Sequence, residues 1–308
     1  MSQKLKTLSY GLPLEVGFNN VSDYELDNSS GERTRTYGVV TLFKTPKYTQ
    51  KIQYEVTVTY LKKDIEKKHW IVQLEKTKVY INQANTERVI DKINEEFMLQ
   101  VLYPIELAIS STGKLIGILN FEEITQRFNK FMTLKRKEYT GIYANRFFTL
   151  LEEKLESAYS LQTSMEKDWF WATFFNSVYF PKGYIGDKKV SKLFPSFNSY
   201  ENCIFYNGEM KVSENYVRNN TISVTHKGAS EKEGSCINID YEINATSFLI
   251  NEVCSNAQLI NENKEVLKTI DVTIRHLREK DIKTEKAQKK EENKNRTIKQ
   301  RFYKWLNT

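Results

Sequence analysis

This 308-residue chain contains three histidines and three cysteines, the residue types that most often ligate zinc. His226 continues an apolar strand face after Val224, and His276 continues another such face after Ile274. Two imidazoles that met beside a cysteine could hold zinc. Zinc sites are marked by paired ligands at short spacing, and the sequence contains no such pair. We therefore expect no metal, and we expect each of these histidines to be satisfied at a strand end.

Adjacent carboxylates at Glu122 and Glu123 could in principle perform acid–base chemistry. They fall at the expected start of a helix, however, where acidic residues favour the helix dipole and the unpaired amides. Gly113 and Gly117 lie inside an expected hairpin and lack the lysine of a phosphate-binding loop, and no Gly-x-Ser-x-Gly elbow is present. The sequence therefore predicts a protein that is not an enzyme and that carries no cofactor.

Aromatic residues are concentrated between Asp168 and Phe180, where seven of thirteen side chains are aromatic. At helical spacing these rings would surround most of one helix, which is typical of a helix buried by a sheet. The alternative is an apolar pocket or exposed aromatic surface, with Trp169, Trp171 and Phe175 as the candidate pocket residues.

The C-terminal residues 281–308 form a basic tail that ends in an amphipathic pattern. We expect a helix that binds a partner protein, a membrane surface or nucleic acid, or that docks on the body of its own chain. Its apolar residues Ile298, Phe302, Trp305 and Leu306 and its basic residues Lys299, Arg301 and Lys304 are the candidate partner-binding residues.

Most of the positive charge lies in this tail. Residues 280–308 contain ten Lys/Arg and four Asp/Glu, which accounts for +6 of the net charge of +7. A nearly neutral body lacks the broad basic face that nucleic-acid binding requires, so we expect no main role in binding nucleic acid. An anionic membrane surface remains a candidate partner for the tail.

The cysteines Cys203, Cys236 and Cys254 are too few and too widely spaced for a disulfide framework. The first residues contain no apolar segment of the kind found in signal peptides, and no apolar run approaches the ~20 residues of a membrane span. We therefore expect a cytoplasmic protein with reduced, unpaired thiols.

Period-two alternation predicts strands on both sides of the centre. The N-terminal strands are expected at 12–18, 36–43, 51–61 and 70–81. The C-terminal strands are expected from about residue 188, with a hairpin turn at Asn207–Gly208 and further strands at 221–226, 236–243, 246–256 and 266–277.

Helical spacing predicts a helix over 86–102 and three more after a central β-hairpin at 103–119. Phe121, Ile124, Phe128 and Phe131 form the apolar stripe of the first of these, with Asn120 expected to cap it and Glu123 to complete a capping box. Tyr143, Phe147, Leu151 and Leu155 form the stripe of the second, which is expected to reach about Tyr159. The third is expected to carry the aromatic residues up to Pro181.

Segregated strands and helices predict an α+β fold, with a curved antiparallel sheet or half-barrel around a central helical insertion and a C-terminal basic helix. In domain terms, residues 1–280 are expected to form one body, made of strands at 1–82, helices and hairpin at 86–180, and strands at 188–279. Residues 281–308 would be a separate tail.

Two resemblances accompany this pattern. The run from Gly113 to Arg127, together with Asp168-Trp-Phe-Trp, resembles uncharacterised bacterial proteins that accompany contractile injection (type VI-like) systems. The order of strands and helices is similar to the half-barrel of lipoprotein-carrier proteins. Those carriers are exported, and because we find no signal peptide here, this second resemblance implies a shared topology and not a shared ligand.

Our functional hypothesis from the sequence is therefore a non-enzymatic adaptor, chaperone or assembly component that binds another protein, in a secretion system if the first resemblance holds. The alternative hypothesis is an apolar ligand bound in a half-barrel cavity, and a third is binding of nucleic acid or a membrane surface through the tail. The cavity alternative requires a concave face that the helices do not fill.

Overall fold

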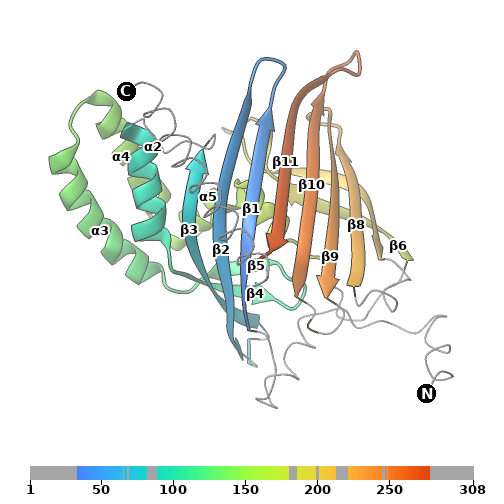
Figure 1. Ribbon diagram of the computed structural model, residues 1–308, viewed down its shortest axis with the longest axis horizontal. Coiled ribbons are helices and arrows are strands. Elements are labelled where there is room, and N and C mark those ends of the chain that lie inside the picture. The colour runs from blue at the N-terminus through green and yellow to red at the C-terminus, as the bar shows by residue number, and fades with distance from the viewer. Residues whose placement is uncertain are drawn as a thin grey trace, which may run out of the picture.

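The computed structural model describes residues 33–64, 66–67, 69–81, 89–179, 186–198, 201–212, 221–244, 247 and 249–277, with no side-chain description for 89–91 and 186–187. Its main feature is an open antiparallel sheet of 11 strands (Figure 1). The strand order is β5-β4-β3-β2-β1-β11-β10-β9-β8-β7-β6. The expectation of a large antiparallel sheet is thus confirmed, and the sheet does not close into a barrel.

The sheet consists of two meanders joined side by side. The first contains β1 (Thr34–Lys44), β2 (Thr49–Asp64), β3 (His69–Ile81), β4 (Ile105–Ser110) and β5 (Leu115–Ile118). The second contains β6 (Gly186–Phe194), β7 (Ile204–Val212), β8 (Thr221–Ser230), β9 (Ser235–Asn244), β10 (Ile250–Ile260) and β11 (Val266–His276). The two meanders meet where β1 pairs with β11, from Tyr37 opposite His276 to Lys44 opposite Thr269.

The strands form where the sequence alternates apolar and polar residues. In β2, Tyr54, Val56, Val58 and Tyr60 are buried and the residues between them are only partly so. Side chains of a strand point alternately to its two faces, so this pattern places one face against a core. The same alternation holds in β9 and in the paired part of β11.

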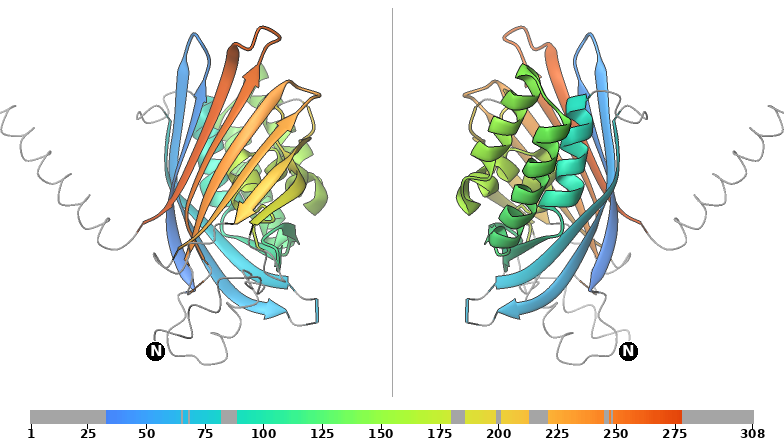
Figure 2. Two further views of the ribbon diagram at one scale, coloured as in Figure 1. Left: turned by 90° about the vertical axis from the view of Figure 1, so that its right-hand side faces the viewer. Right: turned by 90° about the vertical axis from the view of Figure 1, so that its left-hand side faces the viewer.

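The helices gather against one face of the sheet, which curves around them (Figure 2). They are α2 (Val89–Phe97), the π-helical turn η2 (Met98–Leu102), α3 (Phe121–Glu138), α4 (Ile142–Lys154), α5 (Ala158–Glu166) and α6 (Trp169–Phe174). Their apolar side chains and those of the inner sheet face form one hydrophobic core. The concave face is therefore packed with side chains over much of its area.

The apolar stripe of α3 is confirmed, because Ile124, Phe128 and Phe131 are all buried. In α4 the predicted stripe is half right. Leu151 and Leu155 are buried as predicted, but Tyr143 is 78% exposed and the first turns bury Ala144 and Phe148 instead. Adjacent residues point about 100° apart around a helix, so tertiary packing decided between Phe147 and Phe148.

The third helix was predicted as one element reaching Pro181, and this was wrong. The chain forms two short helices, α5 and α6, and leaves the helical conformation after Phe174. Asp168 causes the new start, because its Oδ1 accepts a hydrogen bond of 2.8 Å from the amide of Phe170 and so caps α6.

The predicted cap at Asn120 was also wrong, although α3 begins at the next residue. The side chain of Asn120 turns back to the sheet. Its Oδ1 accepts from the amide of Glu106 at 2.9 Å, and its Nδ2 donates to the carbonyl of Pro104 at 3.2 Å. The Asn120 side chain therefore satisfies the backbone of β4, and it forms no capping hydrogen bond with the amides of α3.

The predicted hairpin at Asn207–Gly208 does not exist, because both residues lie inside the continuous strand β7. Gly208 lies opposite Gly228 of β8. A Cβ atom at position 208 would lie 1.8 Å from the carbonyl oxygen of Lys227. The glycine is therefore required by a close approach of two backbones and not by a reversal of the chain.

Several predictions fall outside the residues that the structure describes. These are the strand at 12–18, the end of the aromatic segment at Phe180, and the basic helix within 281–308. In the described part of the chain, no helix combines the length and apolar character needed to cross a bilayer.

Candidate functional site

A cleft of about 610 Å³ is lined by residues of both edge strands of the open sheet, β5 and β6. Its volume falls within the roughly 300–1,000 Å³ typical of small-molecule sites. One wall comes from the β4–β5 turn and β5, another from β6 and β7, and α6 with the residues after it stands between them. The lining residues are Thr112, Lys114, Leu115, Glu166, Trp171, Ala172, Phe175, Asn176, Ser177, Tyr179, Lys188, Lys189, Val190, Ser191, Lys192, Leu193, Cys203, Phe205 and Met210.

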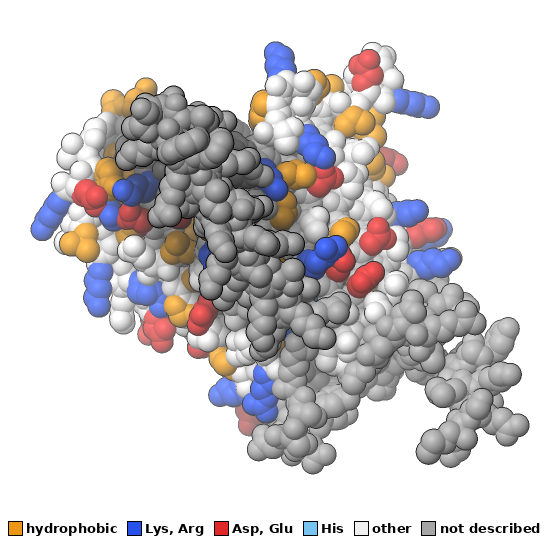
Figure 3. Space-filling view, in the orientation of Figure 1, with side chains coloured by type: hydrophobic (Ala, Val, Ile, Leu, Met, Phe, Trp, Pro, Cys, Tyr) orange, Lys and Arg blue, Asp and Glu red, His pale blue; other side chains and the backbone are white. Residues whose placement is uncertain are grey.

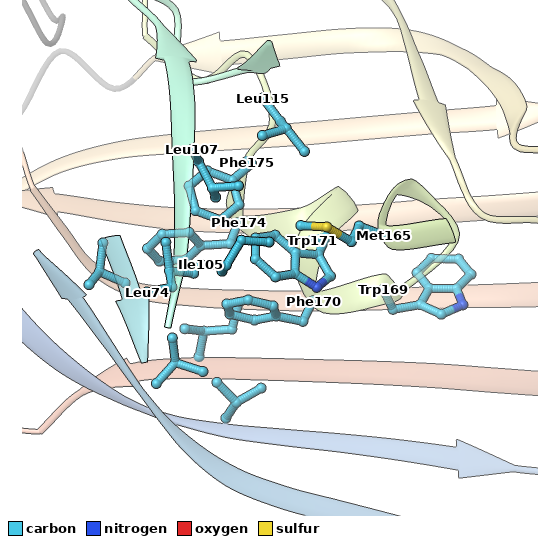
Figure 4. Packing of buried hydrophobic residues seen from close by; sticks show 14 of the residues in the cluster. Leu74, Ile105, Leu107, Leu115, Met165, Trp169, Phe170, Trp171, Phe174 and Phe175 are labelled. Carbon is cyan, nitrogen blue, oxygen red and sulfur yellow. The ribbon is translucent and has the colours of Figure 1, made fainter. Parts of the chain in front are cut away.

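The apolar part of the cleft is built around two rings, that of Trp171 in α6 and that of Phe175 directly after it. Trp171 and Phe175 stack with centroids 5.3 Å apart and an interplanar angle of 21°. They are four residues apart, so the helix places one above the other. Figure 4 shows the rings of α6 grouped with the aliphatic side chains of neighbouring strands. Both rings are at least nine-tenths buried, which fixes their orientation and leaves only small faces toward the cleft.

The segment after α6 is held in place by the β4–β5 turn. The amide of Tyr179 donates to the carbonyl of Thr112 at 3.2 Å, and the hydroxyls of Thr112 and Ser177 lie 3.3 Å apart. Gly113 has a φ of +88°, and a Cβ there would lie 2.8 Å from Cδ2 of Tyr179. Glycine is therefore required at position 113 for two reasons: the turn needs its positive φ, and the ring of Tyr179 leaves no room for a Cβ atom.

A buried lysine lies in the opposite wall. Lys192 of β6 is only 8% exposed, and its Nζ donates a hydrogen bond of 2.7 Å to the carbonyl oxygen of Ser177. Among the described residues, no carboxylate lies within ion-pair distance of Nζ. Burial favours the neutral amine, and it lowers the pKa of Lys192 to about 7.

Behind this wall, His226 of β8 is completely buried. Its ring stacks on Phe194 with centroids 5.8 Å apart, and neither ring nitrogen has a hydrogen-bond partner among the described residues. Burial, and secondarily the charge of Lys192, lowers the pKa of His226 to about 4. The imidazole is therefore neutral near pH 7, and Lys192 is the group that can carry charge here.

The other charged residues that line the cleft are mostly basic. Lys114, Lys188 and Lys189 are exposed. Glu166 is the one carboxylate in the described lining, and its Oε1 accepts from Nε2 of Gln162 at 3.0 Å. The cleft thus combines an apolar wall with a surplus of positive charge.

The candidate pocket residues are separated by the structure. Trp171 and Phe175 line the cleft, but Trp169 does not. Figure 4 shows the indole of Trp169 set apart from the other rings. It packs instead against Phe197, with centroids 5.8 Å apart. That these residues bind a ligand remains a prediction. The candidate partner-binding residues Ile298, Phe302, Trp305, Leu306, Lys299, Arg301 and Lys304 lie outside the described residues.

The two histidines considered for zinc are not brought together. His226 lies in β8 and His276 in β11, with β9 and β10 between these strands. No cluster of three or more metal-ligating side chains occurs among the residues that could be searched. His226 also lies within its strand and not at the strand end where we expected it.

Sequence reasoning missed Lys192 and Met210 as parts of the site. A signal for Lys192 was present, because it alternates with Val190 and Phe194 and so interrupts an apolar strand face with a charge. No comparable signal identified Met210, whose place in the cleft depends on the pairing of β6 with β7.

Comparison with known proteins gives no family. No family model matches the chain, and no curated protein does. Among solved structures, a lipovitellin structure concerned with lipid–protein interactions has a TM-score of 0.45 at 12% identity over 79% of this chain. This chain spans only 25% of that lipovitellin chain.

Two further structures are more distant. A DUF1329 family protein from Desulfovibrio piger has a TM-score of 0.21 at 5% identity, covering 86% of this chain and 94% of its own. An N-terminal dehydratase from the difficidin assembly line has a TM-score of 0.14 at 10% identity, covering 87% of this chain and 86% of its own. Similarities this weak do not define a function, and none of the three concerns a contractile injection system.

Proposed function

We propose that this protein binds an apolar ligand in the cleft between α6 and the strands β6 and β7. The observation that supports this is a cleft of about 610 Å³ in which apolar and aromatic side chains, Trp171 and Phe175 among them, form one part of the lining and polar or charged side chains form the other. Small-molecule sites use apolar walls for affinity and polar groups for orientation, and this cleft offers both. The proposal corresponds to the cavity alternative from the sequence, moved from the centre of the concave face to its side.

The position of the cleft explains how a ligand site coexists with a packed concave face. The rings of Phe170 and Phe174 face the core, where Phe174 contacts Tyr37 of β1 and Phe170 contacts Tyr54 of β2. Trp171 and Phe175, each one position further along the chain, point about 100° away from these rings and line the cleft. The same short segment thus packs some of its rings into the core against the sheet and places others in the lining of the cleft.

The test is to fill the cleft without removing any core side chain. Ala172 lines the cleft and is partly buried, so we expect Ala172→Trp to occupy the volume that an apolar chain would take. Binding of an apolar fluorescent probe should fall at least tenfold. The matched control is Ala229→Trp, because Ala229 is exposed on the outer sheet face. Equal probe binding by both variants would refute the proposal, and Ala172→Leu provides a smaller replacement if the tryptophan variant does not fold.

Binding of another protein is a second candidate function, and one observation favours it. Ile142 and Tyr143, the first two residues of α4, are 80% and 78% exposed. Exposed apolar side chains of this size are common at protein-binding surfaces. The double variant Ile142→Ser/Tyr143→Ser should then weaken partner capture while Ala172→Trp leaves it unchanged. Capture that is equal in all three proteins would exclude this surface.

Charge distribution gives no support to nucleic acid as a partner of the described body. In the space-filling view, lysine and arginine side chains are interspersed with acidic ones over the visible described surface (Figure 3). Phosphate contacts need a continuous basic face.

A further inference from the structure

We propose that the cleft selects an apolar chain that ends in a carboxylate, and that the ammonium group of Lys192 binds this carboxylate. The inference rests on the proposed function, since it names the class of ligand for the same cleft. It predicts that chain and head group are recognised by different walls, so each contribution can be measured separately.

The first step concerns the hydrogen bonds of Lys192. An ammonium group has three donors, and one of them is used by the carbonyl oxygen of Ser177. A buried charge is costly unless it is paired and hydrogen-bonded. The described surroundings of Lys192 supply a neutral carbonyl and no carboxylate. An anion in the cleft would complete both the hydrogen bonding and the charge pairing of this residue.

The second step concerns access. Lys192 and Ser177, the two residues of this hydrogen bond, both line the cleft. The same cleft is lined by Trp171, Phe175 and Met210. A ligand whose head group reaches the ammonium can therefore place its apolar chain against the aromatic wall. A small inorganic anion would satisfy only the first of these contacts, and a neutral apolar molecule only the second.

The third step concerns the sign and size of the charge. Four lysines and one glutamate are the charged residues of the described lining, which favours an anion over a cation. Lys192 is the one of the four that is buried. His226 stays uncharged near pH 7, because burial lowers its pKa to about 4. A single buried cation matches a head group with a single negative charge.

The test compares three probes by calorimetry at pH 6.5, which lies below the pKa of about 7 of Lys192. Dodecanoate carries both the chain and the carboxylate, dodecanol carries the chain alone, and acetate carries the carboxylate alone. We expect the full-length protein to bind dodecanoate at least about tenfold more tightly than dodecanol, the preference that one charge-assisted hydrogen bond can supply. Acetate should bind more weakly than either.

The variant Lys192→Met keeps an unbranched side chain one atom shorter than lysine and removes its charge. It should bind dodecanol as the unmodified protein does and lose the preference for dodecanoate. Lys189→Met is the matched control, because Lys189 lines the cleft but is exposed, and the preference should persist there. If the unmodified protein binds dodecanoate and dodecanol equally, the carboxylate inference is wrong while the proposed function stands. If it binds neither, the proposed function and this inference both fail.

Discussion

The hydroxyl of Tyr241 in β9 donates a hydrogen bond of 3.0 Å to the carbonyl oxygen of Thr173 near the end of α6. The last carbonyls of a helix lack partners within the helix, so a side chain from the sheet satisfies one of them. The bond lies in the core and fixes the short helix that carries Trp171. It therefore connects the sheet directly to the wall of the cleft.

The first prediction is that Tyr241→Phe lowers the free energy of unfolding by about 1–3 kcal/mol, because a buried carbonyl loses its donor. Chemical denaturation would measure this. The cleft should also become less well defined, so the affinity for an apolar probe should fall together with stability. Unchanged stability would show that water or another group satisfies the Thr173 carbonyl.

The second prediction concerns the core under α3. Phe128 is 6% exposed and meets Phe97 of α2 edge-on, with centroids 6.2 Å apart. Phe128→Ala should lower the free energy of unfolding by roughly 3–5 kcal/mol, through lost burial and the cavity it leaves. Tyr143→Ala is the control, since most of that ring is exposed, and it should change stability by about 0.5 kcal/mol or less. A large loss of stability in Tyr143→Ala would show that Tyr143 belongs to the buried face of α4, as the sequence predicted.

The third prediction concerns the close approach of β7 and β8. Gly208→Ala would force a Cβ against the carbonyl oxygen of Lys227, so the strands must separate. We expect a loss of roughly 1–3 kcal/mol or more in unfolding free energy. Gly117→Ala should cost much less, because the nearest atom there, a side-chain oxygen of Gln162, is 4.0 Å away. Equal losses for both variants would contradict the close contact at position 208 as the source of the cost.

The fourth prediction is a pH dependence of stability. The pKa of Lys192 is lowered to about 7, so above that pH the folded protein holds fewer protons on this residue than the unfolded chain does. Stability should therefore rise with pH between about 7 and 9.5, by up to about 1.4 kcal/mol per pH unit from this group. His226 behind the wall is already neutral over this range because its pKa is about 4. Burial raises the pKa of Cys203, which also lines the cleft, so titration of this thiol opposes the rise at the upper end of the range. Glu166, Lys114, Lys188 and Lys189 are the other charged residues of the lining.

Denaturation at pH 7 and pH 9 would measure this slope. Lys192→Met should reduce it, while Lys189→Met should leave it unchanged because Lys189 is exposed. Equal slopes in all three proteins would show that Lys192 titrates at an ordinary pKa.

Much of the fold could be predicted from the sequence, because each strand shows its buried and exposed faces as an alternation of apolar and polar residues. The alternation of Tyr54, Val56, Val58 and Tyr60 is enough to predict β2, and the turn at Gly113 is enough to predict the central hairpin. The pairing of β1 with β11 could not be predicted in this way. It joins residues more than two hundred positions apart, and periodicity contains no information on which strand edges meet.

The site was harder to predict because it depends on those long-range pairings. Trp171 and Phe175 could be proposed from helical spacing alone. Lys192 acquires its role only when β6 is placed beside the segment containing Ser177, which the sequence does not show. The hairpin predicted at Asn207–Gly208 was wrong for the same reason. From local sequence alone, a glycine that is required by a close neighbouring strand cannot be told apart from a glycine that is required by a turn.

The seam between β1 and β11 has a consequence for the order of folding. Every other neighbouring pair of strands in the sheet is consecutive in the chain, so each meander can assemble through comparatively short loop closures. The seam must wait until two distant halves of the chain meet, and contacts of such high sequence separation slow folding. Val39→Ala, within the seam opposite Ile274, should accordingly speed unfolding and leave the refolding rate nearly unchanged. A variant that slows refolding instead would place the seam in the folding nucleus.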